Sequence, residues 1–171
     1  MISPKSFFES LIYNDIEFFT GVPDSLLKNI CSYIADSSDA NNHIIAANEG
    51  NAIAIASGYH LATHKLPLVY LQNSGLGNTI NPLLSLCDPE VYSIPLLVLI
   101  GWRGEPGTFD EPQHISQGRT QLELLNAIKI PYEIISKDDK NFHQKISSCS
   151  QKALNESRPV AIIVKKGTFE N

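Results

Sequence analysis

Glu49 is the first residue whose type and position suggest chemistry. It follows a predicted strand, His43 to Ala47, and stands at the start of a helix rich in small residues. The positive end of the helix dipole favours a carboxylate there, by about 0.3–1 kcal/mol. The alternative interpretation is a partly buried acid that hydrogen-bonds a ring nitrogen of a ligand. The residue alone does not decide between the two.

Asp24 allows a similar choice. It follows Gly21-Val22-Pro23 and either caps the next helix or belongs to a binding site. A second polar segment, Asp110 to His114, places two acids and an imidazole in a glycine-rich stretch. Arg103 and Arg119 flank this segment, and arginine binds anions through paired hydrogen bonds. An anionic substrate is therefore one interpretation and an ordinary polar surface is the other.

Two further patterns are weaker. Ser74-Gly75-Leu76-Gly77 would let a ligand approach the backbone, but Ile80 stands where a dinucleotide fingerprint has its third glycine. His60 and His64 are one helical turn apart, as two metal ligands can be, but the glutamate of the zinc-protease motif is missing. We interpret the histidines as a solvated helix end and predict no metal site in this chain.

Strands and helices alternate along the chain, and these elements must position the side chains named above. The pattern predicts a three-layer α/β/α fold with a mostly parallel sheet of about six strands, covered by helices on both faces. Ligands bind such sheets beyond the carboxyl ends of the strands. Strands are expected near residues 16–19, 43–47, 66–71, 94–100, 132–135 and 160–164.

Two connections are predicted from local composition. The Gly/Pro-rich segment Trp102 to Arg119 is expected to be a long loop, and Thr120-Gln121-Leu122-Glu123 resembles a capping box that opens a helix. Asn73 to Asn78 is expected to be a turn, with Pro82 near the first turn of the next helix.

Composition limits the class of protein. The 171 residues carry 13 Lys and Arg against 18 Asp and Glu, a net charge of −5, and 43% are hydrophobic. We expect one globular domain over residues 1–171, with no basic surface for nucleic acid. The apolar run Ile94 to Ile100 is too short to cross a membrane. The three cysteines are far apart, and no signal peptide is recognisable, so a reducing, cytoplasmic location is expected.

Taken together, five segments resemble one family. They occur in the order Gly21-Val22-Pro23-Asp24-Ser25, Ala47-Asn48-Glu49-Gly50-Asn51-Ala52, Gln72-Asn73-Ser74-Gly75-Leu76-Gly77-Asn78, Gly101-Trp102-Arg103-Gly104-Glu105-Pro106-Gly107 and Asp110-Glu111-Pro112-Gln113-His114. This series resembles the amino-terminal pyrimidine-binding (PYR) domain of phosphonopyruvate decarboxylases, thiamine-diphosphate enzymes of phosphonate biosynthesis. The related sulfopyruvate decarboxylase alpha subunits are similar.

The resemblance implies roles for individual residues. Glu49 would hydrogen-bond the N1′ atom of the aminopyrimidine of thiamine diphosphate, so that the cofactor's amino group can take the C2 proton of the thiazolium. Asp24 and His114 would transfer protons or stabilise intermediates, and Arg103 and His114 would bind the substrate. The residues expected to contact the cofactor are Gly21, Pro23, Glu49, Asn73, Ser74, Gly75, Gly77 and Asn78.

The implied reaction converts 3-phosphonopyruvate, a small anionic 2-oxoacid, to phosphonoacetaldehyde and CO2. Sulfopyruvate is the alternative substrate, and a non-catalytic assembly module with the same fold is the third hypothesis. Family members bind magnesium and the diphosphate in a second (PP) domain marked by Gly-Asp-Gly and Asn-Asn, and no Gly-Asp-Gly occurs here. We therefore expect the PP domain to come from a partner chain or a missing carboxyl-terminal half, and self-association to accompany it.

Overall fold

The computed structural model describes residues 1–170 and contains one six-stranded sheet. The strand order is β2-β1-β3-β4-β6-β5, and every neighbouring pair is parallel. The strands are β1 (Phe19–Gly21), β2 (His43–Ile45), β3 (Leu68–Gln72), β4 (Leu96–Gly101), β5 (Tyr132–Ile135) and β6 (Pro159–Val164). The predicted α/β class is confirmed, with a wholly parallel sheet.

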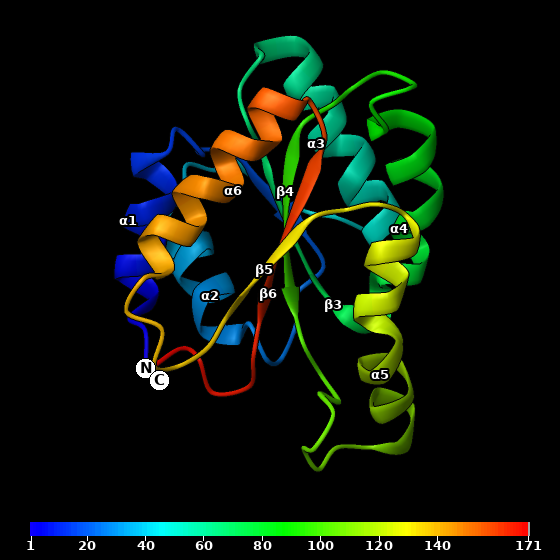
Figure 1. Ribbon diagram of the computed structural model, residues 1–171. Coiled ribbons are helices and arrows are strands. Elements are labelled where there is room, and N and C mark those ends of the chain that lie inside the picture. Colours follow the sequence, from blue (N-terminus) through cyan, green and yellow to red (C-terminus); the bar gives the residue numbers. More distant parts are fainter. Residues whose placement is uncertain (171) are drawn as a thin grey trace.

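Helices cover both faces of this sheet, which gives the predicted three layers (Figure 1). One face carries α1 (Pro4–Tyr13), α2 (Lys28–Ser37) and α6 (Phe142–Glu156). The other face carries α3 (Glu49–Thr63), α4 (Leu76–Pro82) and α5 (Pro112–Ala127), with the π-helical turn η2 (Leu83–Cys87). No helix within residues 1–170 is long and apolar enough to cross a membrane.

β4 lies in the middle of the sheet, and all six of its residues are buried. Leu97 and Leu99 pack against α1, α2 and α6, whereas Val98 and Ile100 pack against the opposite helices. This alternation follows from the two-residue repeat of a strand. Each fully buried side chain of this size contributes about 1.5–3 kcal/mol, so β4 anchors both layers.

The segment after β4 differs from its prediction. The loop ends at Glu111, and α5 begins at Pro112, because a proline suits the first position of a helix. Thr120 therefore lies inside α5, and the capping box predicted at 120–123 is wrong. Gly118, which indicated a loop, is a buried helix residue packed so closely on Gly104 that a methyl group there would overlap its backbone.

The predicted turn at 73–78 is also helical. A 3-10 turn, η1 (Asn73–Gly75), leads directly into α4. Pro82 is the last residue of α4 instead of belonging to a first turn, and the π-helical turn η2 follows it. Because proline lacks a backbone N–H, the regular hydrogen-bond ladder changes at this point. The polar residues of this segment are thus fixed on helical backbone.

The two ends of the chain lie side by side (Figure 1). Ile2 and Phe169 form a parallel bridge, in which the Ile2 N–H donates to Thr168 O at 2.7 Å. The Phe169 ring packs edge-on against Phe7, with ring centroids 5.1 Å apart, and Phe7 stacks on Phe142. The carboxyl-terminal segment is therefore part of the core beneath α1 and α6.

Candidate active site

The predicted site residues lie where the strands end. All strands are parallel, so their carboxyl ends share one edge of the sheet, the usual ligand-binding edge of this fold class. Asp24 follows β1, Glu49 follows β2 as the first residue of α3, and Arg103 follows β4. In Figure 1 the segment after β4 extends beyond this edge before the chain returns along α5.

Glu49 is held between two neighbouring segments. Asn48 fixes the start of α3, because its side chain accepts a hydrogen bond from the Asn51 N–H at 2.9 Å. Asn78 donates from Nδ2 to Glu49 Oε2 at 2.8 Å, whereas Oε1 has no hydrogen-bond partner in the described part of the chain. The half-buried carboxylate lies directly against Gly75, where a methyl group would overlap it. The hydrogen bond from Asn78 thus positions the carboxylate through one oxygen and leaves the other oxygen unpaired.

Asp24 is a buried acid, only 5% exposed. Its Oδ2 accepts a hydrogen bond from the Leu27 N–H at 3.1 Å, but α2 begins at Lys28 with Leu27 as its N-cap residue, so Asp24 closes the turn before the helix instead of capping it. Its Oδ1 is buried without a partner among the described residues. Burial raises the pKa of Asp24, although hydrogen bonds from the backbone and the charges of Arg103 and His114 oppose the rise. Asp24 therefore orders the turn before α2 and keeps one buried oxygen without a partner among the described residues.

His114 lies in the first turn of α5, close enough to Asp24 for their charges to interact. Its Nδ1 is buried and has no hydrogen-bond partner within residues 1–170. Gly104 supports this position: it has a φ of +65°, and a methyl group there would overlap the backbone of His114. Glycine is required at such a close approach with a left-handed backbone.

Arg103 is already paired within the chain. Its Nε and Nη2 donate to the two carboxylate oxygens of Asp110 at 2.8 and 2.6 Å, and Nη1 donates to Ser25 Oγ at 3.0 Å. Asp110 also accepts from the backbone N–H groups of Gly104 and Glu111. The guanidinium holds the pKa of Asp110 well below its usual range. This pair folds the loop after β4 onto its own start.

The other predicted contact residues fall into two groups. Asn73 is buried, and its amide joins β3 to β4 by donating to Arg103 O at 2.8 Å and accepting from the Arg103 N–H at 3.1 Å. Ser74 accepts a hydrogen bond from the Gln72 amide. Gly21 is buried against Tyr70, whereas Pro23 is exposed and Gly77 is exposed with open space around it.

Two features of this edge were not predicted. Asp110 is the partner of Arg103, which the proximity of the two residues in one short loop could have indicated. Gln117 lies one helical turn after His114, and its buried Oε1 lacks a partner in the described chain. The three-residue spacing indicates a shared face only when both residues are known to be helical. Because the sequence predicted a loop as far as Arg119, the shared face of His114 and Gln117 was not recognised.

His60 and His64 end α3, as the sequence suggested. His64 caps the helix in a left-handed conformation, and His60 Nδ1 bonds Lys65 O at 2.9 Å. Within residues 1–170, no three His, Cys, Asp or Glu side chains gather in a way that would hold a metal ion.

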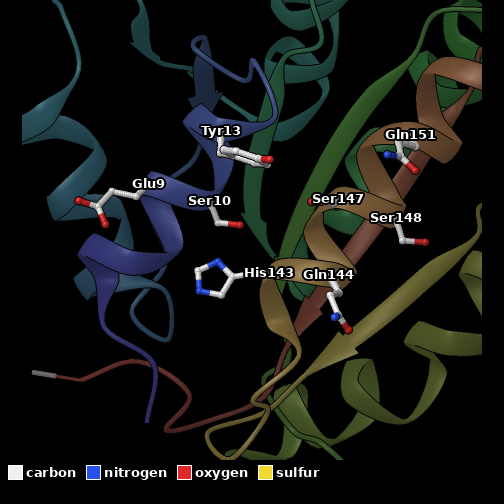
Figure 2. Close-up of a pocket in the computed structure, with 8 residues that line it drawn as sticks. All are labelled: Glu9, Ser10, Tyr13, His143, Gln144, Ser147, Ser148 and Gln151. Carbon is white, nitrogen blue, oxygen red and sulfur yellow. The ribbon is translucent and has the colours of Figure 1, made fainter.

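A groove of about 560 Å³ lies elsewhere, between α1 and α6 (Figure 2). It is lined by Glu9, Ser10, Tyr13, His143, Gln144, Ser147, Ser148 and Gln151. None of the predicted site residues lines it. The carboxyl edge remains the place that carries an acid with an unpaired buried oxygen, an imidazole with an unpaired buried nitrogen and the positioned Glu49 carboxylate.

The sequence of this chain also matches a known protein family. Residues 5–126 match the family described as "Thiamine pyrophosphate enzyme, N-terminal TPP binding domain". The chain belongs to this family. The matched range includes Asp24, Glu49 and His114 and ends within α5.

Individual relatives are similar over most of this chain. The chain is 32% identical to "Sulfopyruvate decarboxylase subunit alpha" of Methanococcus maripaludis, and the match covers 96% of this chain and 95% of the relative. It is 34% identical to "Phosphonopyruvate decarboxylase" of Streptomyces viridochromogenes, covering 86% of this chain but 36% of that relative. The chain therefore spans nearly all of one relative and about a third of the other.

A solved structure has the same fold. The benzoylformate decarboxylase of Polynucleobacter necessarius superposes on the whole chain with a TM-score of 0.72 and 19% sequence identity, over 31% of its own length. At that identity the likeness concerns the fold.

Proposed function

We propose that this chain is the pyrimidine-binding half of a thiamine-diphosphate-dependent 2-oxoacid decarboxylase that acts on a 3-substituted pyruvate with an anionic tail. 3-Phosphonopyruvate, converted to phosphonoacetaldehyde and CO2, is the first candidate substrate. The proposal rests on Glu49, whose Oε2 is held by Asn78 while Oε1 is left unpaired against Gly75. The names of the relatives support the class of reaction.

The described residues suit the aminopyrimidine end of this cofactor. Glu49 Oε1 is available to a ring nitrogen, and the neighbouring α4 surface is open at Gly77, where an added methyl group would touch nothing within 4 Å. When bound, thiamine diphosphate would supply both the carbon nucleophile that adds to the keto group and the thiazolium ring that accepts the electron pair released with CO2. Glu49, Gly75, Gly77 and Asn78 are the residues that we propose hold the pyrimidine.

Asp24 and His114 are proposed to hold and move protons beside the reacting carbon. Each has a buried polar atom without a partner among residues 1–170, and such atoms are rare because they cost free energy unless a ligand satisfies them. The raised pKa of Asp24 favours its protonated form, which can donate a hydrogen bond or a proton. These are the roles that the resemblance implied.

A sulfopyruvate decarboxylase alpha subunit is the second candidate. The observation that favours it is coverage, because this chain matches nearly the full length of such a subunit. In both cases we propose that a separate diphosphate-binding chain, or a further segment, supplies the PP domain and the magnesium site. We also propose self-association, for which α3 offers the exposed small residue Ala54.

Reconstitution tests the proposal. The chain is mixed with a diphosphate-binding chain that carries Gly-Asp-Gly and Asn-Asn, together with thiamine diphosphate and Mg²⁺, and CO2 release is measured from each acid. We expect activity only when both chains are present. Glu49→Gln is expected to lower kcat by about a hundredfold or more, because the ring nitrogen loses its carboxylate partner. Glu123→Gln, an exposed change on α5, is the matched control.

Two results would overturn this proposal. Steady turnover by the chain alone would exclude the two-part arrangement, and near-normal turnover by Glu49→Gln would remove Glu49 from its role. A calorimetric titration with thiamine diphosphate and Mg²⁺, with and without the partner chain, tests the non-catalytic hypothesis: no heat of cofactor binding in either case would favour an assembly module.

A further inference from the structure

A cavity of about 500 Å³ at the carboxyl edge carries positive charge that no described residue neutralises. We infer that this cavity binds the anionic tail, a phosphonate or a sulfonate, of the substrate. The inference rests on the proposed function and assigns the tail-binding residues within it. It assigns the tail to Lys28, Lys166 and Ser25, whereas the sequence had suggested Arg103.

The cavity adjoins the candidate active site. It lies between the segments that follow β1, β4 and β6, and both Ser25 and Arg103 line it. Ser25 is the neighbour of the buried acid Asp24, and the Arg103 guanidinium bonds Ser25 Oγ at 3.0 Å. The cavity is thus connected, through Ser25, to the acid that we propose moves protons.

Arg103 contributes little free charge, since both carboxylate oxygens of Asp110 bind its guanidinium. Lys28 and Lys166 also line the cavity, and neither forms an ion pair with any carboxylate in residues 1–170. Two ammonium groups therefore remain for a ligand. Their charge suits a tail that carries one or two negative charges.

Two features without a formal charge add to this attraction. α2 begins at Lys28, which places the positive end of a ten-residue helix at the cavity, and anions bind well at such a helix start. Ser25 Oγ accepts its hydrogen bond from Arg103, which leaves the hydroxyl hydrogen free to donate to an anion. Arg103 acts here as a positioning residue, because it orients Ser25 through that bond.

The test compares three acids with different tails on the reconstituted enzyme: 3-phosphonopyruvate, 3-sulfopyruvate and pyruvate. In Lys28→Gln and Lys166→Gln we expect KM for the preferred anionic acid to rise about tenfold each, the usual order for losing a charge-assisted hydrogen bond. The kcat for that acid, and kcat/KM for pyruvate, which has no anionic tail, are expected to change less than about twofold. The larger effect identifies whether the phosphonate or the sulfonate is the natural tail.

Lys152→Gln is the matched control, because Lys152 lies on α6 away from this cavity. An equal fall for all three acids would mean a structural role for the lysines and would overturn the inference. An unchanged KM for both anionic acids would also overturn it. The same holds if only the thiamine diphosphate concentration needed for activity rises, because the cavity would then be assigned to the cofactor's diphosphate.

A second measurement separates this inference from the proposed function. Phosphonoacetate and sulfoacetate are titrated into the full chain without a partner, and amide chemical shifts are followed by NMR. Shifts at residues 25–29 and 166–169 that disappear in the double lysine variant support the cavity even when no acid is decarboxylated. The absence of any such shift in the unsubstituted chain would overturn it even when the enzyme is active.

Discussion

Asp24 shows how an acid can be held in an unfavourable state. One of its oxygens accepts a hydrogen bond from the Leu27 N–H, and the other is buried without a partner among the described residues. Gly101 lies so close to Asp24 that a methyl group there would overlap Oδ2. A buried carboxylate with an incomplete set of hydrogen bonds destabilises the folded chain in its charged form. Such a cost is commonly found at functional sites.

Asp24→Asn is therefore expected to stabilise the fold at pH 7, by about 1 kcal/mol. The asparagine oxygen retains the bond from Leu27 and removes the charge. Because the pKa of Asp24 is raised above 3.8 in the folded state, its favourable contribution is complete below that pH and is lost as the pH rises through the folded pKa. Urea unfolding from pH 3 to 8 measures this difference, which is expected to vanish at the acid end.

Asp36→Asn, an exposed change on α2, is the control for this measurement. We expect it to leave the free energy of unfolding unchanged at both ends of the pH range, and the reconstituted Asp24→Asn enzyme to lose most of its kcat. A variant that is less stable than the parent at pH 7 would show that the charge of Asp24 is well compensated.

At the scale of residues, the sequence indicated the acids but not their partners. Asp24 and Glu49 stand out because each follows an apolar segment, and this position is visible in one dimension. The ion pair of Arg103 with Asp110 depends on how the loop folds back, and the orphaned oxygen of Gln117 depends on a helix start that composition had concealed. Sequence proximity makes the Arg103–Asp110 pair possible, but only the fold of the loop and the start of α5 establish the two contacts.

The contact between α3 and η1 determines where the Glu49 carboxylate lies. Gly75→Ala is expected to displace that carboxylate, because the added methyl group overlaps it. We predict that the cofactor concentration needed for half-maximal activity rises about tenfold or more, while the fold is retained. Activity of the reconstituted enzyme, measured against thiamine diphosphate concentration, and the circular dichroism spectrum check both parts.

Gly58→Ala provides the matched control, because it adds the same methyl group elsewhere on α3. Gly58 is exposed in α3, and an added methyl group would contact nothing within 4 Å. Since alanine favours helix over glycine, this variant is expected to gain about 0.5–1 kcal/mol of stability without a change in the cofactor requirement. Similar behaviour of the two variants would mean that the Gly75 contact does not position Glu49.

At the scale of elements, the number and direction of the strands were predictable, but the starts of two helices were not. Strands such as β4 are continuous apolar runs, which a buried parallel sheet requires. Glycine and proline in the other segments had two interpretations. Gly118 permits close packing on Gly104, and Pro112 opens α5, although together they resembled the composition of a loop.

At the scale of the whole molecule, the carboxyl-terminal segment closes one layer of the core. Phe169 is 6% exposed and packs edge-on against Phe7. Phe169→Ala is expected to lower the free energy of unfolding by about 3 kcal/mol, because it removes a buried ring and leaves a cavity. Trp102 is the single tryptophan of the chain and is buried, so its fluorescence during urea unfolding reports the change.

Phe109→Ala is the control, because the Phe109 ring is 93% exposed in the loop after β4. Its unfolding midpoint is expected to equal that of the parent chain. If Phe169→Ala were also neutral, the carboxyl-terminal segment would be a peripheral attachment instead of a part of the core.

The bridge between Ile2 and Phe169 also sets the geometry of any polypeptide fused to this domain. Both ends emerge at one place, and Phe169 itself lines the rim of the lysine-bearing cavity. A module joined after the last strand would start its path next to the proposed tail-binding residues, with no need for a long linker to reach them.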